Sequence, residues 1–305
     1  ETGDPMKSLK WTRKSLDKIA FELKSLGIVV SANTVGRLLK EMGYSLRINL
    51  KTVESGNANP PTPEIRNQQF KNIAKKRAEY EASGNPAISV DTKKRELVGN
   101  FKNNGSSWRR EPIHVKDHDF PSDAIGKATP YGIYDTLQNQ GFVSLGVSCD
   151  TPRFAVDAIE TWWSCKGINQ YADAKQILIL ADSGGSNSAR SRVWKMRLQE
   201  FANRFNVKID VCHYPPGASK WNPIEHRLFS EISKNWGGKP LVSFQTILNY
   251  IRTTRTCTGL NVTAVFNRKK YYKGEKVPND KMAKINLLKH NILPKWNYSL
   301  APHRL

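Results

Sequence analysis

The stretch 177-ILILADSGGSN-187 is the part of the sequence that decides the fold. Four branched aliphatic residues and Ala181 form an apolar run, which is typical of a strand buried on both faces. The run ends at Asp182, and the two glycines and the polar residues that follow predict a tight, open turn. A carboxylate at the mouth of a buried strand is either a turn cap or part of an acidic site. Only partners elsewhere in the chain can decide between these.

Charge is the strongest global feature of the 305-residue chain. It carries 48 Lys and Arg against 27 Asp and Glu, a formal net charge of +21, spread along its length. A globular protein this basic usually binds a polyanion, most often nucleic acid. A basic surface that serves solubility, or association with ribosomes, is the alternative.

Composition excludes several other classes. The hydrophobic content of 38% excludes a disordered chain. No apolar run is long enough for a membrane span, and the start ETGDPMKSLK lacks the apolar core of a signal peptide. The first residue is Glu1 and not Met, so we expect sequence to be missing ahead of it. The cysteines have no zinc-finger spacing, and we expect reduced, mostly buried thiols. They are Cys149, Cys165, Cys212 and Cys257.

Residues 1–50 predict a small all-α helix-turn-helix domain. Two apolar stripes at helical spacing are separated by Gly27, and the second runs from Ser31, a good N-cap, to Gly43. In such a motif the second helix enters the major groove of DNA. The residues that we expect to contact DNA are Asn33, Thr34, Arg37, Lys40 and Arg47. A helical hairpin with a solvated basic face is the alternative.

Two further regions follow. Residues 51–86 predict a linker with a basic helix, which packs either on a neighbour or on DNA phosphates. Residues 87–305 predict a second domain with a basic, aromatic tail. Its expected elements are a strand ending at Asp91, paired strands at 128–138 and 141–150, a helix at 152–164, the strand of the opening stretch, a helix at 188–205, a strand at 207–216 and a helix after Asn222. This is the order of the ribonuclease H fold, an α/β class with a mixed sheet and flanking helices.

Three acidic residues stand at corresponding places in this order. Asp91 ends the first strand, Asp182 ends the first strand after the crossover helix, and Glu225 lies on the last helix. The first and fourth strands of a ribonuclease H-like sheet are neighbours. We therefore expect the carboxylates of Asp91 and Asp182 within about 4–6 Å, close enough to share one Mg²⁺, with Glu225 nearby.

Such a cluster suits metal-dependent cleavage of phosphodiesters. Two Mg²⁺ ions, with Mn²⁺ as a substitute, could activate the attacking oxygen and stabilise the leaving one. Without metal, three close carboxylates repel each other and their pKa values rise. The alternative is that these acids only cap turns or favour a helix N-terminus. Asp135 and Asp150 also end expected strands, and Glu231 lies on the same helix as Glu225, but we expect all three outside the site.

The stretch 213-HYPPGASKWNPIEHRLFSEISKNW-236 resembles the signature of DDE transposases, in which the Glu of the N-P-I-E pattern is the third catalytic acid. The closer resemblance is to the Rhodopirellula-type DDE transposases, a bacterial insertion-sequence group distantly related to mariner elements. The similar blocks are 88-ISVDTKKRELVGNFKN-103, 118-HDFPSDAIGKATPYGIYD-135, 181-ADSGGSN-187 and 252-RTTRTCTGL-260. The chain departs from mariner-like enzymes in the 43 positions between Asp182 and Glu225, a longer spacing than theirs.

The resemblance implies a DNA transposase with Asp91, Asp182 and Glu225 as catalytic residues and metal ligands. Its partners would be double-stranded DNA and further copies of the chain, in a homodimer or higher oligomer, in the bacterial cytoplasm at the nucleoid. Lys93 and Lys94 would contact DNA phosphates or lie in a solvated turn. We expect two side chains to support the acids, namely Asn222 and His226, with a proton shuttle or a DNA contact as the alternatives for His226. The alternatives are an inactive DNA-binding derivative and a structure-specific nuclease of the same fold.

Overall fold

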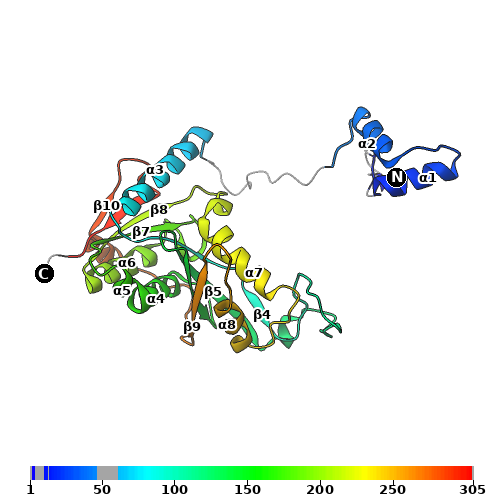
Figure 1. The fold of residues 1–305 in the computed structure, drawn as a ribbon. Helices are drawn as coiled ribbons and strands as arrows, with labels where there is room; N and C mark the ends of the chain where they lie inside the picture. The colour runs from blue at the N-terminus through cyan, green and yellow to red at the C-terminus, as the bar shows by residue number, and fades with distance from the viewer. Residues whose placement is uncertain (1, 4–9, 13, 47–60, 304–305) are drawn as a thin grey trace. The chain divides into compact units, whose positions relative to one another are not determined.

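The computed structural model describes residues 2–3, 10–12, 14–46 and 61–303 (Figure 1). The chain divides into two compact units, Glu1–Gly56 and Asn57–Leu305.

The N-terminal unit contains the two helices that the sequence predicts, packed against each other. Each begins at a serine whose hydroxyl accepts a backbone hydrogen bond, Ser15 in the first helix and Ser31 in the second. Gly27 and Gly43 follow the helices at φ of +83° and +82°, the left-handed conformation that ends a helix. The elements are β1 (Thr2–Gly3), β2 (Lys10–Trp11), α1 (Leu16–Ser25) and α2 (Ala32–Glu41).

A mixed sheet lies at the centre of the second unit (Figure 1). Within the described residues its strand order is β10-β11-β8-β7-β3-β5-β6-β9, with β4 paired to β5. The strands are β3 (Ala87–Thr92), β4 (Glu96–Val98), β5 (Gly126–Asp135), β6 (Gln140–Gly146), β7 (Gln176–Ala181), β8 (Lys208–His213), β9 (Asn261–Asn267), β10 (Leu287–Lys289) and β11 (Asn297–Leu300).

The central order β6-β5-β3-β7-β8 is that of a ribonuclease H-like sheet, and the predicted fold class is confirmed. In particular, β3 and β7 are parallel neighbours, with Val90 paired to Ala181. The described strands are shorter than expected at their ends. The first hairpin strands stop at Asp135 and Gly146, and β8 stops at His213.

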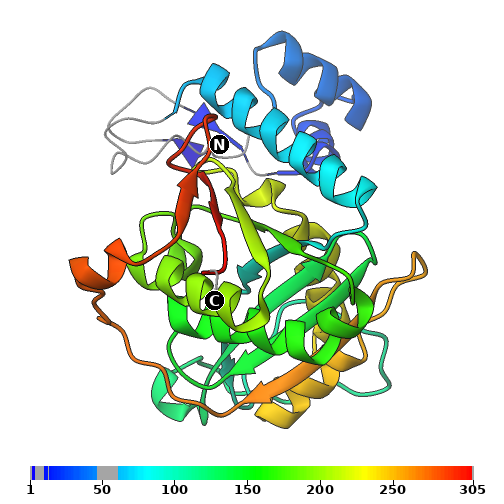
Figure 2. The ribbon, with the colours of Figure 1, turned by 90° about the vertical axis from the view of Figure 1, so that its left-hand side faces the viewer.

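Helices cover both faces of the sheet (Figures 1 and 2). On one face α4 (Pro152–Trp162) and α6 (Arg192–Phe205) enclose a core in which Ile159 and Trp194 are fully buried. The helix expected at 188–205 begins only at Arg192, because Ser191 caps it and 185–187 form a short 3-10 turn. The other face carries α3 (Pro63–Ala82), a π-helical turn (Glu225–Phe229), α7 (Ser230–Trp236) and α8 (Phe244–Arg252).

The basic helix α3 is fastened to this sheet. Ile73 and Tyr80 pack against a core cluster that includes Leu180 of β7. The buried side chain of Gln69 donates a hydrogen bond to the carbonyl of His213, at 2.7 Å. The sequence left open whether this helix packs on a neighbour, and the structure places it on the second unit.

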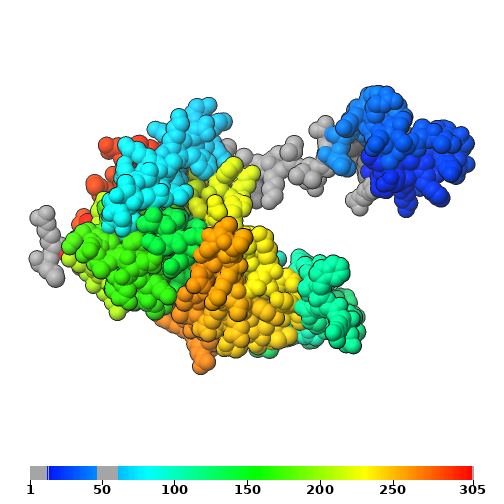
Figure 3. All heavy atoms as spheres, viewed as in Figure 1, coloured from blue at the N-terminus to red at the C-terminus, as the bar shows by residue number. Residues whose placement is uncertain are grey.

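The tail contains strands that the sequence did not predict. β9 lies along β6 at one edge of the sheet, and β11 and β10 extend the other edge beyond β8. The connection between β4 and β5 projects from the body of this unit (Figure 3). The expectation of mostly buried thiols is wrong, because only Cys212 is buried and Cys165 and Cys257 are exposed on helix and turn surfaces. In the described part of the chain, no helix is both long and apolar enough to cross a membrane.

Candidate active site

Asp91 and Asp182 lie side by side at the carboxyl edge of the sheet. Asp91 is in β3, and Asp182 directly follows the last residue of β7. Because Val90 and Ala181 are partners in this parallel pair, the two aspartates are next in register and point to the same face. Neighbouring strands are about 4.8 Å apart, which brings the two side chains into interaction range. The carboxylate separation of about 4–6 Å stays a prediction.

Glu225 is held over the same strand by its own loop. Asn222 is fully buried, and its Nδ2 donates to the carbonyl of Val90 at 3.2 Å. The backbone N–H of Ile224 donates to Ser89 Oγ at 3.1 Å. Both acceptors, in Ser89 and Val90, lie within two residues of Asp91. The supporting role expected for Asn222 therefore has a physical basis, since it docks the loop that carries the third acid.

The three acids repel each other electrostatically. Burial, followed by the negative charge of Asp182, raises the pKa of Asp91 to about 8. Burial also raises the pKa of Asp182 to about 6, with the charges of Glu225 and Asp150 adding to the effect. Burial raises the pKa of Glu225, while the nearby ammonium of Lys93 opposes that rise. The cluster is therefore costly to ionise without a cation.

The oxygen atoms of this cluster suit a hard divalent cation. Asp182 Oδ1 is buried and has no hydrogen-bond partner. An unpaired buried acceptor is costly, and Mg²⁺ prefers such carboxylate oxygens. Among the described residues, however, no group of three or more His, Cys, Asp or Glu side chains is arranged to hold a metal ion. Glu225 nevertheless lies next to Asp91, whose carboxyl group acts on its pKa, so the three acids belong to one cluster.

A buried histidine fixes the backbone at Asp182. His213 Nδ1 donates to the Asp182 carbonyl at 2.8 Å, and its Nε2 accepts from the Tyr298 hydroxyl at 3.1 Å. That hydroxyl in turn accepts from Trp194 Nε1 at 2.9 Å. Burial lowers the pKa of His213 to about 4, so the ring is neutral at pH 7. These contacts give His213 a structural role.

Lys93 does not have the exposure that a phosphate contact requires. Its side chain is buried, and its ammonium lies 3.1 Å from Glu96 Oε1 and 4.7 Å above the ring of Trp236. A buried ammonium is stabilised by such a partner and such a ring. The contact of Lys93 with DNA phosphates stays a prediction, and in this structure its charge acts on Glu225. Lys94 is exposed.

The three other acidic residues singled out in the sequence differ in how close they lie to the acidic cluster. Asp135 is remote from the cluster, since it accepts from the Tyr171 hydroxyl and from the backbone of its own turn. Glu231 is paired with Lys234 on the surface of α7. Asp150 was also expected outside the site; its carboxylate accepts from Thr92 Oγ1 at 3.0 Å, in the residue after Asp91, and its charge acts on Asp182.

Several of the side chains expected to contact DNA are exposed. Thr34 contributes to the cap of α2, where its N–H donates to Ser31 Oγ. Arg47 lies outside the described residues. His226 is exposed, and its Nε2 contacts the carbonyl of Lys220. The other expected side chains, all exposed, are Asn33, Arg37 and Lys40.

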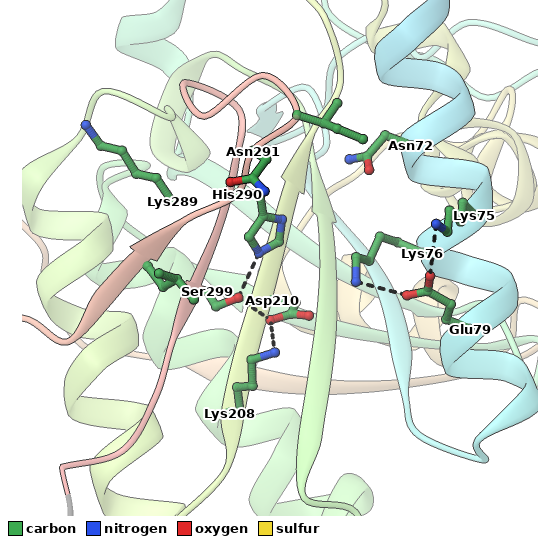
Figure 4. A pocket seen from close by; sticks show the side chains of 12 residues that line it. Asn72, Lys75, Lys76, Glu79, Lys208, Asp210, Lys289, His290, Asn291 and Ser299 are labelled. Carbon is green, nitrogen blue, oxygen red and sulfur yellow. Dashed lines mark hydrogen bonds and ion pairs between the residues drawn. The ribbon is translucent and has the colours of Figure 1, made fainter.

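A separate hollow of about 440 Å³ lies between α3 and the β10–β11 hairpin (Figure 4). Its buried carboxylate, Asp210, accepts from Lys208 at 2.9 Å and from Ser299 at 2.6 Å, and Ser299 contacts His290. Lys208 pairs with Gln176, at the start of both strands. This hollow therefore lies away from the carboxyl edge of the sheet and is not part of the acidic site.

The strand order and the acids at the carboxyl edge define a ribonuclease H-like domain with an acidic centre. The chain belongs to a transposase family, since the family model described as the Rhodopirellula transposase DDE domain matches residues 1–302. The family expected from the sequence is confirmed. A comparison with curated proteins gives no match.

Solved structures of the Mos1 transposase share a distant likeness with the chain. The paired-end complex with the left transposon end has 13% identity and a TM-score of 0.45, over 78% of this chain and 65% of that one. The Mos1 mariner paired-end complex with Mn has 14% identity and a TM-score of 0.45, over 82% and 72%. This chain thus spans just under two thirds of the first Mos1 chain. Assignment of the fold rests on the strand order.

Proposed function

We propose that this chain is a DNA transposase that cleaves a DNA strand at the ends of its element and joins the freed 3′-hydroxyl to target DNA. Membership of the family supports the general activity. The observation that carries the chemistry is the placement of Asp91 and Asp182 at adjacent ends of parallel strands. Their raised pKa values and the unpaired oxygen of Asp182 favour a cation between them.

Asp91, Asp182 and Glu225 would hold Mg²⁺, or Mn²⁺ in its place, in a two-ion site. Bound ions supply the charge that activates the attacking oxygen and stabilises the leaving one. His213, neutral at pH 7, keeps the backbone of Asp182 in place, and Asn222 anchors the loop of Glu225.

Two phosphoryl-transfer steps follow from this arrangement. Water first attacks the phosphorus at the element end, and the bond to the 3′-oxygen breaks, which leaves a 3′-hydroxyl and a 5′-phosphate. The 3′-hydroxyl then attacks a phosphodiester of the target, and a target 3′-hydroxyl is released. Both nucleophiles come from water or DNA, so no covalent enzyme intermediate is expected.

Double-stranded DNA is the partner that the charge of +21 favours. The exposed side chains of Asn33, Arg37 and Lys40 in α2 would contact the element ends. Because two ends have to be joined, we propose a homodimer or a higher oligomer in the synaptic complex. A protein of this kind would act at the bacterial nucleoid.

The test is DNA cleavage by the full chain with Mg²⁺ or Mn²⁺, on duplexes that carry the DNA flanking its gene. We expect nicks at the boundary of a terminal repeat and joining of that end to a second duplex. Asp182→Asn should abolish both and leave DNA binding intact. Asp135→Asn, a buried carboxylate away from the cluster, serves as the matched control and should still cleave.

Three results would overturn the proposal. Cleavage by Asp182→Asn equal to that by the unmodified chain would remove the acids from the chemistry. Binding without cleavage would identify a DNA-binding derivative. Cleavage that depends on DNA shape alone, without joining, would identify a structure-specific nuclease.

A further inference from the structure

Asp150 lies beside the acidic cluster although it comes from a different part of the sheet. β5 is antiparallel to both β3 and β6, so β6 runs parallel to β3. The loop that follows β6 therefore leaves the sheet at the same edge as Asp91 and Asp182.

A chain of hydrogen bonds connects Asp150 to both aspartate loops. Thr92 Oγ1 donates to Asp150 Oδ1 at 3.0 Å, and the Thr92 N–H donates to Asp91 Oδ1 at 2.7 Å. The Thr92 hydroxyl also lies 3.3 Å from Ser186 Oγ, in the turn that follows Asp182. Ser186 is buried, with 5% of its surface exposed. Thr92 therefore connects the end of β3 to the turn after β7.

That turn needs such a connection. Gly184 and Gly185 precede Ser186, and Gly185 has a φ of +57°, a conformation that glycine adopts freely. Such a segment holds the backbone next to Asp182 only weakly by itself. The hydrogen bond from the Tyr131 hydroxyl to Asn187 Oδ1, at 2.7 Å, fastens the far end of the turn. The contact between Thr92, Asp150 and Ser186 fastens the near end.

We propose that Asp150 is a positioning residue of the acidic site, which fixes the separation of Asp91 and Asp182 through Thr92 and Ser186. This inference rests on the proposed function, in which the two aspartates bind divalent ions together. Asp150 itself need not touch the ions. Its carboxylate orients the Thr92 hydroxyl and so sets the geometry of the pair.

The test is Mn²⁺ binding to the full chain without DNA, measured through the decrease in the spectroscopic signal of free Mn²⁺. A hydrogen bond to a charged group contributes about 1.5–3 kcal/mol, so Thr92→Val and Asp150→Ala should each weaken binding about tenfold or more. Thr92→Ser keeps the hydroxyl and should bind as the unmodified chain does. Asp150→Asn keeps an acceptor and should bind at least about threefold more tightly than Asp150→Ala. The double variant Thr92→Val/Asp150→Ala should be no weaker than the weaker single variant, because both break one network.

Thr129→Val is the matched control. Thr129 is buried in β5, and its hydroxyl donates to the carbonyl of Ser148 at 2.8 Å, in the same loop as Asp150. It should lose stability without losing Mn²⁺ affinity. If Thr92→Val binds Mn²⁺ like this control, or if the Asn and Ala variants of Asp150 bind equally, the positioning role is refuted and the proposed function stands. If the unmodified chain binds no Mn²⁺, the metal chemistry of the proposed function fails and this inference fails with it.

Discussion

Replacing Asp91 by Asn should abolish cleavage and yet stabilise the metal-free protein at pH 7. Asp91 is half-buried beside Asp182, and desolvation together with the charge of Asp182 raises its pKa from an ordinary value of 3.8 to about 8. The folded state therefore holds a proton that the unfolded state has lost at neutral pH. Asn removes this difference and keeps the Oδ1 that accepts from the Thr92 N–H.

The size of the effect follows from proton linkage. Each pKa unit corresponds to about 1.4 kcal/mol, so at pH 7 the shift costs the native state up to about 4 kcal/mol. Asn still has to find a partner for its Nδ2, which reduces the expected gain to about 2 kcal/mol. For a unit of the size of Asn57–Leu305, this corresponds to a rise in Tm of about 4–8 °C. Because the folded pKa is raised, wild-type stability is lost as the pH rises from about 4 to about 8, and the gain from Asn grows over the same window.

Thermal melts in EDTA at pH 5, 6, 7 and 8 provide the measurement. Asp157→Asn is the contrasting control. Although burial raises the pKa of Asp157, hydrogen bonds from Lys269, Arg197 and Tyr271 hold it below its ordinary value. That variant should lose stability at pH 7. An Asp91→Asn protein no more stable than the unmodified chain, or a gain that does not grow with pH, would refute the electrostatic account.

Three further outcomes are expected. Mn²⁺ at about 100 times its Kd should stabilise the unmodified chain by about 2.7 kcal/mol, and Asp182→Asn should lose most of this shift in Tm. Lys93→Met should cost about 3 kcal/mol in chemical denaturation, because it leaves the Glu96 carboxylate without its buried partner, and Glu96→Gln in the same chain should restore most of the loss. His213→Phe should cost about 2 kcal/mol, because the Asp182 carbonyl loses its donor and the Tyr298 hydroxyl keeps only its bond from Trp194 Nε1; a cost near zero would mean that neither bond of His213 contributes to stability.

The central sheet could be predicted because its signals are local. An apolar run that stops at a carboxylate marks both β3 and β7, and adjacency in the ribonuclease H order then places Asp91 beside Asp182. The outer strands could not be predicted in this way. β10 has only three residues, and β9 pairs with β6 across more than a hundred positions of sequence. Long-range pairing and burial decide such strands, and a short window of sequence records neither.

The surroundings of two side chains near the acidic cluster could not be predicted from the sequence. The sequence around Lys93 is that of a solvated turn, but Glu96 and Trp236 pack against its side chain. Asp150 looks remote until the direction of β6 is known. One signal could have indicated Asp150: the predicted hairpin makes β6 parallel to β3, so residues just after β6 emerge at the edge where Asp91 lies. The direction of each strand is thus as informative as its position.

The π-helical turn at Glu225–Phe229 has a consequence for how the site tolerates change. In this turn the Ser230 N–H bonds to the Glu225 carbonyl five residues earlier, one residue more than in an α-helix. The extra residue shifts the helical repeat, so the side chain of Glu225 points in a different direction from the apolar side chains of α7. Insertions or deletions in the long segment between Asp182 and Glu225 can thus accumulate without turning the acid away from the sheet, provided that the wide turn is kept. Loss of one residue within it should turn Glu225 away from Asp91 while α7 stays packed, so the direction of Glu225 depends on the turn and not on its distance along the chain.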